Sequence, residues 1–127
     1  MESRFGCDRC WPADAAAAWE ARRGLSTVAE LVDESHLHVM LLRCDACGQR
    51  FLSVFTEIVD WADGEDSQYW KLLPLTAAEA EALQRESLNL ARLEAVGSDR
   101  RCLRRDWPKG EEARAWWGSG LVIGPHA

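Results

Sequence analysis

The 127-residue sequence lacks the features of membrane and secreted proteins. No stretch approaches the roughly 18 uninterrupted apolar residues of a membrane-spanning helix. Residues 1–21 hold acids, Pro12 and cysteines where a signal peptide requires an apolar run. These absences predict a cytoplasmic protein with no membrane contact.

Positive charge is also scarce, because 15 Lys and Arg residues stand against 21 Asp and Glu residues, giving a formal net charge of −6. An acidic surface repels the phosphate backbone of nucleic acids over most of its area. Nucleic-acid binding by the whole surface is therefore excluded, whereas binding by a local basic face is not.

The motifs of several common enzyme classes are absent as well. The sequence contains no G-x-G-x-x-G and no Walker loop, and Gly118-Ser119-Gly120 does not have the G-x-S-x-G spacing of a nucleophile elbow. No Ser/His/Asp grouping is evident. The sequence shows no catalytic set and favours a protein that is not an enzyme.

Four of the five cysteines form two C-x-x-C pairs, Cys7 with Cys10 and Cys44 with Cys47. Two intervening residues let one tight turn direct two sulfur atoms at a single point, and four thiolates at about 2.3 Å complete a tetrahedral zinc shell. In a reducing compartment this pattern favours a metal over disulfides. We expect one structural Zn²⁺ per chain, bound by these four cysteines.

The second pair is followed by Gly48, at a position where a zinc knuckle commonly needs a positive φ. With its two knuckles, the segment over residues 1–75 resembles the broad class of four-cysteine zinc ribbons. The resemblance implies a structural metal and often a contact surface for protein or nucleic acid. The 33 residues between the pairs, 11–43, exceed the roughly 15–20 of compact ribbons and predict an insertion.

Two other chemistries fit part of the cysteine pattern. Rubredoxin-type iron uses paired C-x-x-C motifs, but one of its knuckles usually reads C-P-x-C-G, and neither pair here has that proline. A thiol redox protein would use Cys7 and Cys10 before an alanine-rich helix, whose N-terminus lowers a thiol pKa. That alternative leaves Cys44 and Cys47 without a role. The fifth cysteine, Cys102, is interpreted as a small core residue.

The remaining patterns predict an α+β fold, an antiparallel β-meander that carries the zinc-ribbon-like site and is covered by helices. A short alanine-rich helix is expected over Pro12–Arg23, with Gly24 as its stop. Four β-prone runs follow, at Ser26–Asp33, His36–Arg43, Arg50–Trp61 and Ser67–Leu75. A second helix is expected from the capping box Thr76-Ala77-Ala78-Glu79 to about Val96.

The charge balance changes near residue 96. Residues 1–95 hold 17 acids and 9 bases, a balance of −8, whereas residues 96–127 hold 4 acids and 6 bases, a balance of +2. We therefore expect a zinc-ribbon-like α+β domain over residues 1–96. A separate C-terminal helical arm with an apolar tail is expected over residues 97–127.

The expected arm supplies the candidate interaction residues. Its arginines recur at a spacing that gathers them on one side if residues 98–107 are helical, and tryptophans lie beside and after them. The candidates are Arg100, Arg101, Arg104, Arg105, Trp107, Trp116 and Trp117. The apolar tail Leu121-Val122-Ile123 follows, and such a segment docks on its own domain, on a second copy or on a partner.

The sequence therefore predicts a non-catalytic zinc protein that acts as a protein-interaction module, through a protein partner or a homodimer formed by the arm. Two alternatives stay open. One is a nucleic-acid-associated zinc ribbon that uses the basic helix face, which the net charge makes less favoured. The other is a thiol redox protein that uses the first C-x-x-C. The acids Asp60, Asp63, Glu65 and Asp66 are interpreted as a solvated hairpin turn.

Overall fold

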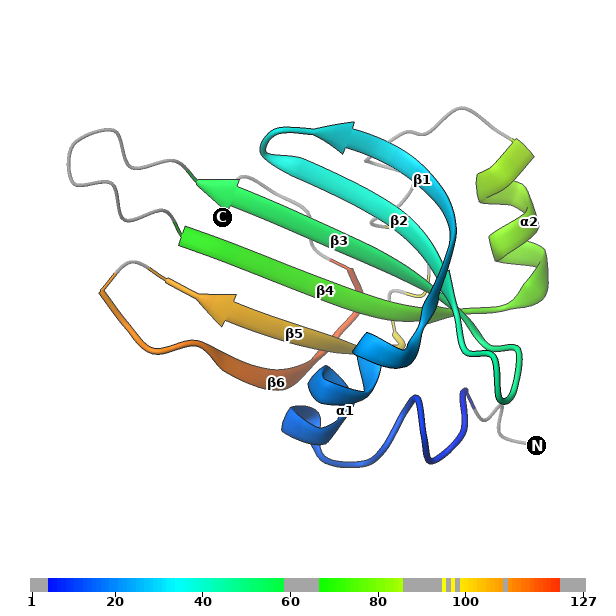
Figure 1. Cartoon of the computed structure of the whole chain (residues 1–127), viewed down its shortest axis with the longest axis horizontal. Coiled ribbons are helices and arrows are strands. Elements are labelled where there is room, and N and C mark those ends of the chain that lie inside the picture. Colours follow the sequence, from blue (N-terminus) through cyan, green and yellow to red (C-terminus); the bar gives the residue numbers. More distant parts are fainter. Residues whose placement is uncertain are drawn as a thin grey trace.

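The computed structural model describes residues 5–58, 67–85, 95, 97, 99–108 and 110–121. These residues form one six-stranded antiparallel sheet in which every strand pairs with its neighbours along the chain (Figure 1). The strands are β1 (Ser26–Glu34), β2 (Leu37–Arg43), β3 (Arg50–Ile58), β4 (Ser67–Leu75), β5 (Arg101–Trp107) and β6 (Arg114–Ser119). The predicted α+β class and the antiparallel meander of β1 to β4 are confirmed.

Two α-helices accompany the sheet within the described ranges. Helix α1 (Ala15–Ala21) begins later than expected, because the Asp14 carboxylate accepts a hydrogen bond from the Ala17 amide at 2.8 Å and caps the first turn. A short 3₁₀ turn, η1 (Arg22–Gly24), follows it. Helix α2 (Ala77–Arg85) begins at the predicted capping box, with both reciprocal bonds formed between Thr76 and Glu79, at 2.8 and 3.1 Å. The rest of the helix expected up to residue 96 lies largely outside the described residues.

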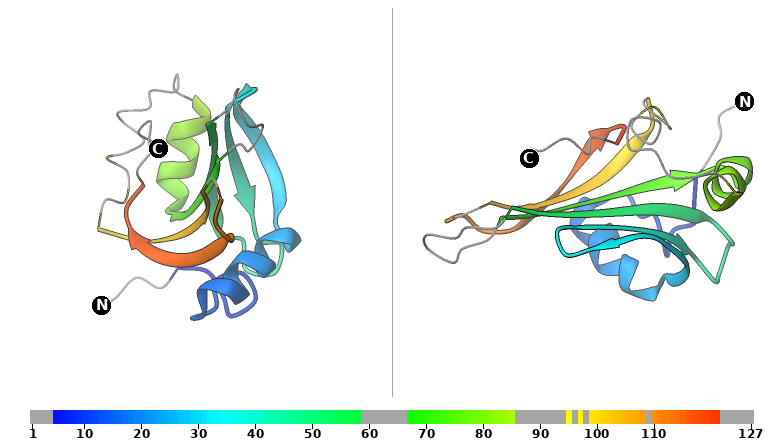
Figure 2. Two further views of the ribbon diagram at one scale, coloured as in Figure 1. Left: turned by 90° about the vertical axis from the view of Figure 1, so that its left-hand side faces the viewer. Right: turned by 90° about the horizontal axis from the view of Figure 1, so that it is seen from above.

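The two helices cover opposite sides of the sheet (Figure 2). Successive residues of a strand point to opposite sides, so each strand contributes to two cores. The core on the α2 side is formed by Val39, Leu41, Leu52, Val54, Leu73, Leu75, Ala80, Cys102 and Leu121. The core on the α1 side is formed by Cys10, Trp11, Ala18, Trp19, Leu42, Cys44, Phe51, Leu72 and Leu103.

The predicted helix over residues 98–107 is wrong, because residues 101–107 form strand β5. Leu103 pairs with Leu72 of β4 and with Trp117 of β6. Cys102 is buried on the α2 side and Leu103 on the α1 side, so the strand fills both cores with two adjacent residues. Burial on both faces and pairing with two strands outweigh the helix propensity of the arginines.

The residues of the expected C-terminal arm and its apolar tail pack on their own chain as far as the structure describes them. The Trp117 indole donates to the carbonyl oxygen of Ala13 at 2.9 Å, and the Trp116 indole donates to the Asp106 carboxylate at 2.8 Å. Leu121 is 2% exposed in the α2-side core. Val122 and Ile123 lie outside the described residues. Self-association through residues 97–127 stays a prediction of the sequence.

The expected acidic hairpin turn with Asp60, Asp63, Glu65 and Asp66 falls in residues 59–66, which lie outside the described residues. Strands β3 and β4 on either side of it pair in register from Ile58 with Ser67 to Arg50 with Leu75. Among the residues that are described, no helix combines the length and the apolar composition needed to cross a bilayer.

The pairing of β5 with β6 predicts the effect of a small substitution at Gly118. A Cβ atom at this position would overlap the guanidinium of Arg104, which donates to the carbonyl oxygens of Ser119 and Gly120 at 3.0 and 3.2 Å. We expect Gly118→Ala to displace Arg104 and to lower the free energy of unfolding by about 1–3 kcal/mol, measured by urea denaturation. Gly24→Ala is the control, because nothing lies within 4 Å of a Cβ there. Equal stability of the two variants would contradict this packing.

Candidate metal centre

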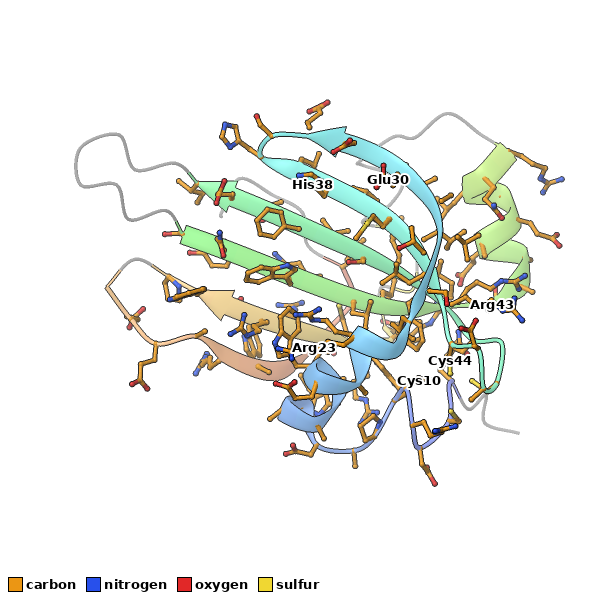
Figure 3. The ribbon with its side chains drawn as sticks, in the orientation of Figure 1. Cys10, Arg23, Glu30, His38, Arg43 and Cys44 are labelled. Carbon is orange, nitrogen blue, oxygen red and sulfur yellow. The ribbon has the colours of Figure 1, made fainter. Side chains whose placement is uncertain are left out.

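The four paired cysteines come from two turns that meet at one end of the sheet (Figure 3). Cys7 and Cys10 lie in a turn that precedes α1, and Cys44 and Cys47 lie in the turn that joins β2 to β3. The antiparallel pairing of β2 with β3 fixes the second turn, since Arg43 is opposite Arg50 at the end of the ladder. The first turn reaches it from a segment that has no strand of its own.

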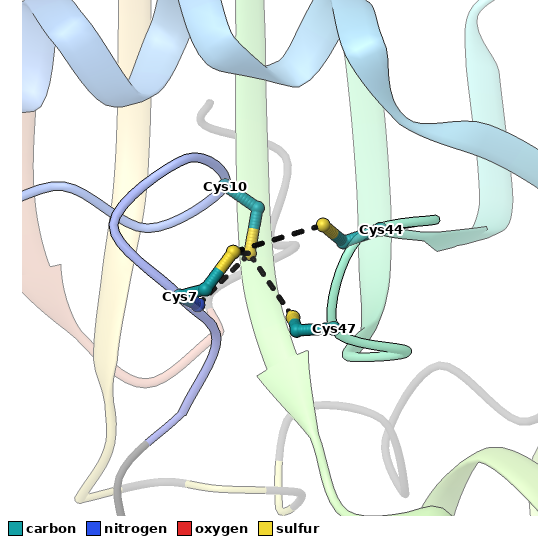
Figure 4. Close-up of side chains that lie close together, drawn as sticks. All are labelled: Cys7, Cys10, Cys44 and Cys47. Carbon is teal, nitrogen blue, oxygen red and sulfur yellow. Dashed lines mark hydrogen bonds between the residues drawn. The ribbon is translucent and has the colours of Figure 1, made fainter.

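The four sulfur atoms converge on one point (Figure 4). The Sγ of Cys7 lies 3.7 Å from that of Cys10 and 3.9 Å from that of Cys44, and the Sγ atoms of Cys10 and Cys47 are 3.8 Å apart. All four lie within 4.8 Å of one another. These cysteines are free, and the distances are well above the roughly 2.05 Å of a disulfide bond. A metal–sulfur distance of about 2.3 Å in a tetrahedron places the sulfurs about 3.8 Å apart, so the cluster fits a metal ion.

The first turn depends on a glycine that has no room for a side chain. Gly6 has a φ of 69°, and a Cβ there would lie 2.7 Å from the Cβ of Trp11 and 3.0 Å from the Sγ of Cys10. The turn closes through the Trp11 amide, which donates to the Cys7 carbonyl oxygen at 2.8 Å. The Cys7 amide points at the Cys10 sulfur at 3.2 Å, as the amides of metal-binding turns do.

The second turn has the form that its sequence predicts. Gly48 has a φ of 81° and donates its amide to the Cys44 carbonyl oxygen at 2.8 Å. The Cys44 amide in turn donates to the carbonyl oxygen of Gln49 at 2.9 Å. The Ser26 hydroxyl, at the start of β1, donates to the Asp45 carboxylate at 2.7 Å, so the neighbouring strand also holds this turn.

Gln49 joins the two turns, a role that the sequence analysis missed. Its Oε1 accepts from the Gly6 amide at 2.9 Å, and its Nε2 donates to the carbonyl oxygens of Leu75 and Arg50 at 2.6 and 2.7 Å. One amide side chain therefore connects the N-terminal segment to the ends of β3 and β4. A single glutamine after a knuckle has no periodicity or motif that would indicate this role.

The surroundings of Cys7 and Cys10 shift the pKa values of these two thiols in opposite directions. The backbone N–H groups of Cys10 and Arg9 point toward the Cys7 sulfur and lower the pKa of Cys7 to about 7. Burial raises the pKa of Cys10, which is 2% exposed, well above its usual range. A thiol that burial keeps protonated becomes a thiolate when a nearby cation compensates its charge. The cluster is therefore suited to a cation that binds four sulfurs together.

The cluster is coupled to the α1-side core through aromatic rings. Trp11, directly after the first pair, has its ring centroid 5.3 Å from that of Phe51 and 5.0 Å from that of Trp117. The guanidinium carbon of Arg101 lies 3.9 Å from the Trp117 ring centroid. The first turn thus packs, through Trp11, against β6 and the start of β5.

The arginines that were expected to share one helix face are distributed over different surroundings. Arg100 donates to the Pro74 carbonyl oxygen at 2.7 Å and forms an ion pair with Glu79 at 2.8 Å. Arg101 and Arg105 lie on the α1 side of β5, whereas Arg104 lies on the α2 side with Cys102. The predicted basic helix face does not form, because a strand sends adjacent side chains to opposite sides.

The contrast between two glycines predicts how the first turn supports metal binding. Gly6→Ala introduces both backbone strain at positive φ and a clash with Trp11 and Cys10. Gly110→Ala introduces the same strain at a φ of 74° but meets nothing within 4 Å. We expect Gly6→Ala to weaken Zn²⁺ binding about 10–100-fold in a chelator competition, because it moves a ligand. Gly110→Ala is expected to cost about 1 kcal/mol of stability and to leave the metal affinity unchanged; equal metal affinities in the two variants would contradict the geometry of the turn.

No protein-family model, curated protein or solved structure compared with the chain gives a match. The four cysteines lie close enough together to hold a metal ion.

Proposed function

We propose that the protein is a non-catalytic zinc-binding protein with a structural, zinc-ribbon-like site, in which Cys7, Cys10, Cys44 and Cys47 bind one Zn²⁺ per chain. The convergence of four sulfurs at the spacing of a tetrahedral shell carries this proposal. Thiolate ligands in a tetrahedron favour zinc over the hard cations Mg²⁺ and Ca²⁺. Four protein ligands fill the shell, whereas a catalytic zinc keeps one position open for water or substrate.

The proposed metal would act by joining two distant segments. The N-terminal turn otherwise reaches the sheet through one Gln49 amide and the packing of Trp11. Structural zinc contributes apparent binding energies on the order of 10 kcal/mol in small domains, which is enough to hold such a segment. We infer that such a protein acts by binding a partner through its surface, as a cytoplasmic interaction module.

The thiol redox alternative has one observation in its favour, the pKa of about 7 that the backbone gives Cys7. A redox pair, however, exchanges its disulfide with an external partner and needs no further thiols. Here each thiol of the first pair lies within 4 Å of a sulfur of the second pair, Cys7 beside Cys44 and Cys10 beside Cys47. A single four-sulfur site explains all four cysteines, so we favour it.

The proposal predicts that ligands from the two turns are equivalent. Purified protein is expected to contain close to one zinc per chain and no iron by elemental analysis. Cys7→Ser and Cys44→Ser are both expected to lose the metal and to unfold at a similarly lowered temperature, because either change opens the same shell.

Cys102→Ser is the matched control, because Cys102 is also buried but lies in the α2-side core away from the cluster. It is expected to retain the full zinc content. Full zinc content in Cys7→Ser would contradict a shared site. Metal-free protein with a Cys7–Cys10 disulfide would support the redox alternative instead.

A further inference from the structure

The α1 side of the sheet is only partly covered. Helix α1 lies over one end of the strands, where Trp19 packs with Leu72 and Leu103 (Figure 1). Toward the other end, the register places four residues in a row across neighbouring strands. They are His38 of β2, Phe55 of β3, Trp70 of β4 and Arg105 of β5. Helix α1 covers the Trp70 end of this row, where the ring centroid of Trp19 lies 5.3 Å from that of Trp70. We call the row, together with Trp107, the aromatic face.

The rings of His38, Phe55 and Trp70 pack against one another along the row. The ring centroids of His38 and Phe55 are 5.8 Å apart, and those of Phe55 and Trp70 are 4.9 Å apart. Trp107 lies on the same side of β5 as Arg105 and is 48% exposed. His38, Phe55 and Trp70 are half-buried, and an exposed tryptophan beside half-buried rings on one sheet face indicates a binding surface.

Guanidinium groups lie on the same side as these rings. The guanidinium carbon of Arg105 is 4.6 Å from the ring centroid of Trp19 and 5.4 Å from that of Trp70. That of Arg22 is 3.6 Å from the Trp19 centroid. Among the residues that the structure describes, no carboxylate forms an ion pair with Arg22 or Arg105. Stacking on a ring uses the flat face of a guanidinium and leaves its N–H edge for an anion.

A small cavity lies between Arg22 and the rings. It has a volume of about 110 Å³ and is lined mainly by apolar side chains, with Trp19, Arg22, Phe55 and Trp70 among them. The Nε of Arg22 is buried and has no hydrogen-bond partner. A buried donor without a partner is unfavourable unless a ligand supplies an acceptor. The site therefore offers a flat apolar surface together with an unused cationic donor.

We propose that the aromatic face binds single-stranded nucleic acid, with bases stacked on Trp107 and on the half-buried Phe55 ring and phosphates paired with Arg22 and Arg105. Each nucleotide of a single strand presents an accessible ring and a phosphate, which matches the two chemistries found side by side here. In a duplex the bases are already stacked and cannot reach the rings. This inference identifies a ligand for the proposed interaction module and therefore rests on the proposed function.

The acids of this part of the sheet do not block the proposed site. Asp33 faces the His38 imidazole at 3.2 Å, and Glu57 accepts from Gln68, the residue opposite Trp107, at 2.9 Å, so each of these carboxylates has a partner of its own. Glu20 forms an exposed ion pair with Arg23 at 3.5 Å. The formal charge of −6 opposes a long polyanion, so we expect a short footprint and a modest affinity.

The test uses zinc-loaded full-length protein and labelled oligo-dT and oligo-U strands of about 12 nucleotides, with a duplex of equal length, followed by fluorescence anisotropy. Both single strands are expected to bind and the duplex is not. Two phosphate contacts predict that the logarithm of the binding constant falls with the logarithm of the salt concentration with a slope of about −1.4. This salt slope corresponds to a loss of about sevenfold in affinity between about 50 and 200 mM salt. Equal or tighter binding of the duplex would overturn the proposal.

Matched variants locate the binding surface. Trp107→Ala is expected to weaken binding about tenfold through the loss of one stacking ring. Ile58→Ala removes a similarly exposed side chain (45%) that points to the α2 side, and it is expected to have no effect. Arg105→Gln is expected to weaken binding and to reduce the salt slope by about 0.7, whereas Arg43→Gln, at an exposed position of β2 on the α2 side, leaves both unchanged.

Three further outcomes would also overturn the inference. The first is no binding at about 100 µM protein, well beyond the concentration at which a modest stacking site is occupied. The second is binding that Trp107→Ala and Arg105→Gln leave unchanged. The third is tighter binding of a random copolymer of glutamate and tyrosine, which would indicate a protein partner. Zinc is measured in every sample: a zinc-loaded chain without binding refutes the aromatic face alone, and a metal-free folded chain that binds refutes the metal proposal alone.

Discussion

The meeting of two turns at the cysteine cluster is the contact on which the order of the N-terminal half depends. Residues 5–14 form no helix or strand and contact the sheet through the thiols, one Gln49 amide, the Phe5 and Trp11 rings and the Ala13 carbonyl oxygen. Because Trp11 packs against Phe51 of β3 and Trp117 of β6, the position of the first turn also determines the packing of the α1-side core. A metal held by four thiolates would therefore order α1 and the edge strand β6 along with its own ligands.

The chemistry of the thiols explains why the cluster needs a cation to do this. Thiols are weak hydrogen-bond donors and weak acceptors, so contacts of 3.7–3.9 Å between protonated sulfurs hold two chain segments poorly. Burial keeps Cys10 protonated in the absence of a compensating charge, because it raises the pKa of that thiol. A divalent cation would replace the protons and provide metal–ligand bonds in place of the weak contacts. Metal binding and the attachment of the N-terminal segment are thus expected to occur together.

The parts of this structure that local patterns specify could be predicted from the sequence. The C-x-x-C spacing and Gly48 indicate turns that are built within a few residues, and the capping box at Thr76 is equally local. Strand β5 could not be predicted, because the spacing of its arginines fits a helix as well as a strand, and its pairing with β4 and β6 decides between them. The roles of Gly6 and Gln49 also arise where two distant segments meet, and no pattern in either segment alone indicates them.

Adjacent Arg104 and Arg105 show how a strand divides one basic run between two roles. Arg104 points to the α2 side and uses its N–H groups on the carbonyl oxygens of Ser119 and Gly120, which holds the end of β6. Arg105 points to the α1 side and lies across tryptophan rings, an interaction that uses its π face and leaves its N–H edge for another partner. A chain with a net charge of −6 can meet an anion only where cations gather without paired acids. The alternation of β5 places such a cation beside the exposed Trp107 ring, and a ligand that combines flat rings with phosphates is the one that uses both.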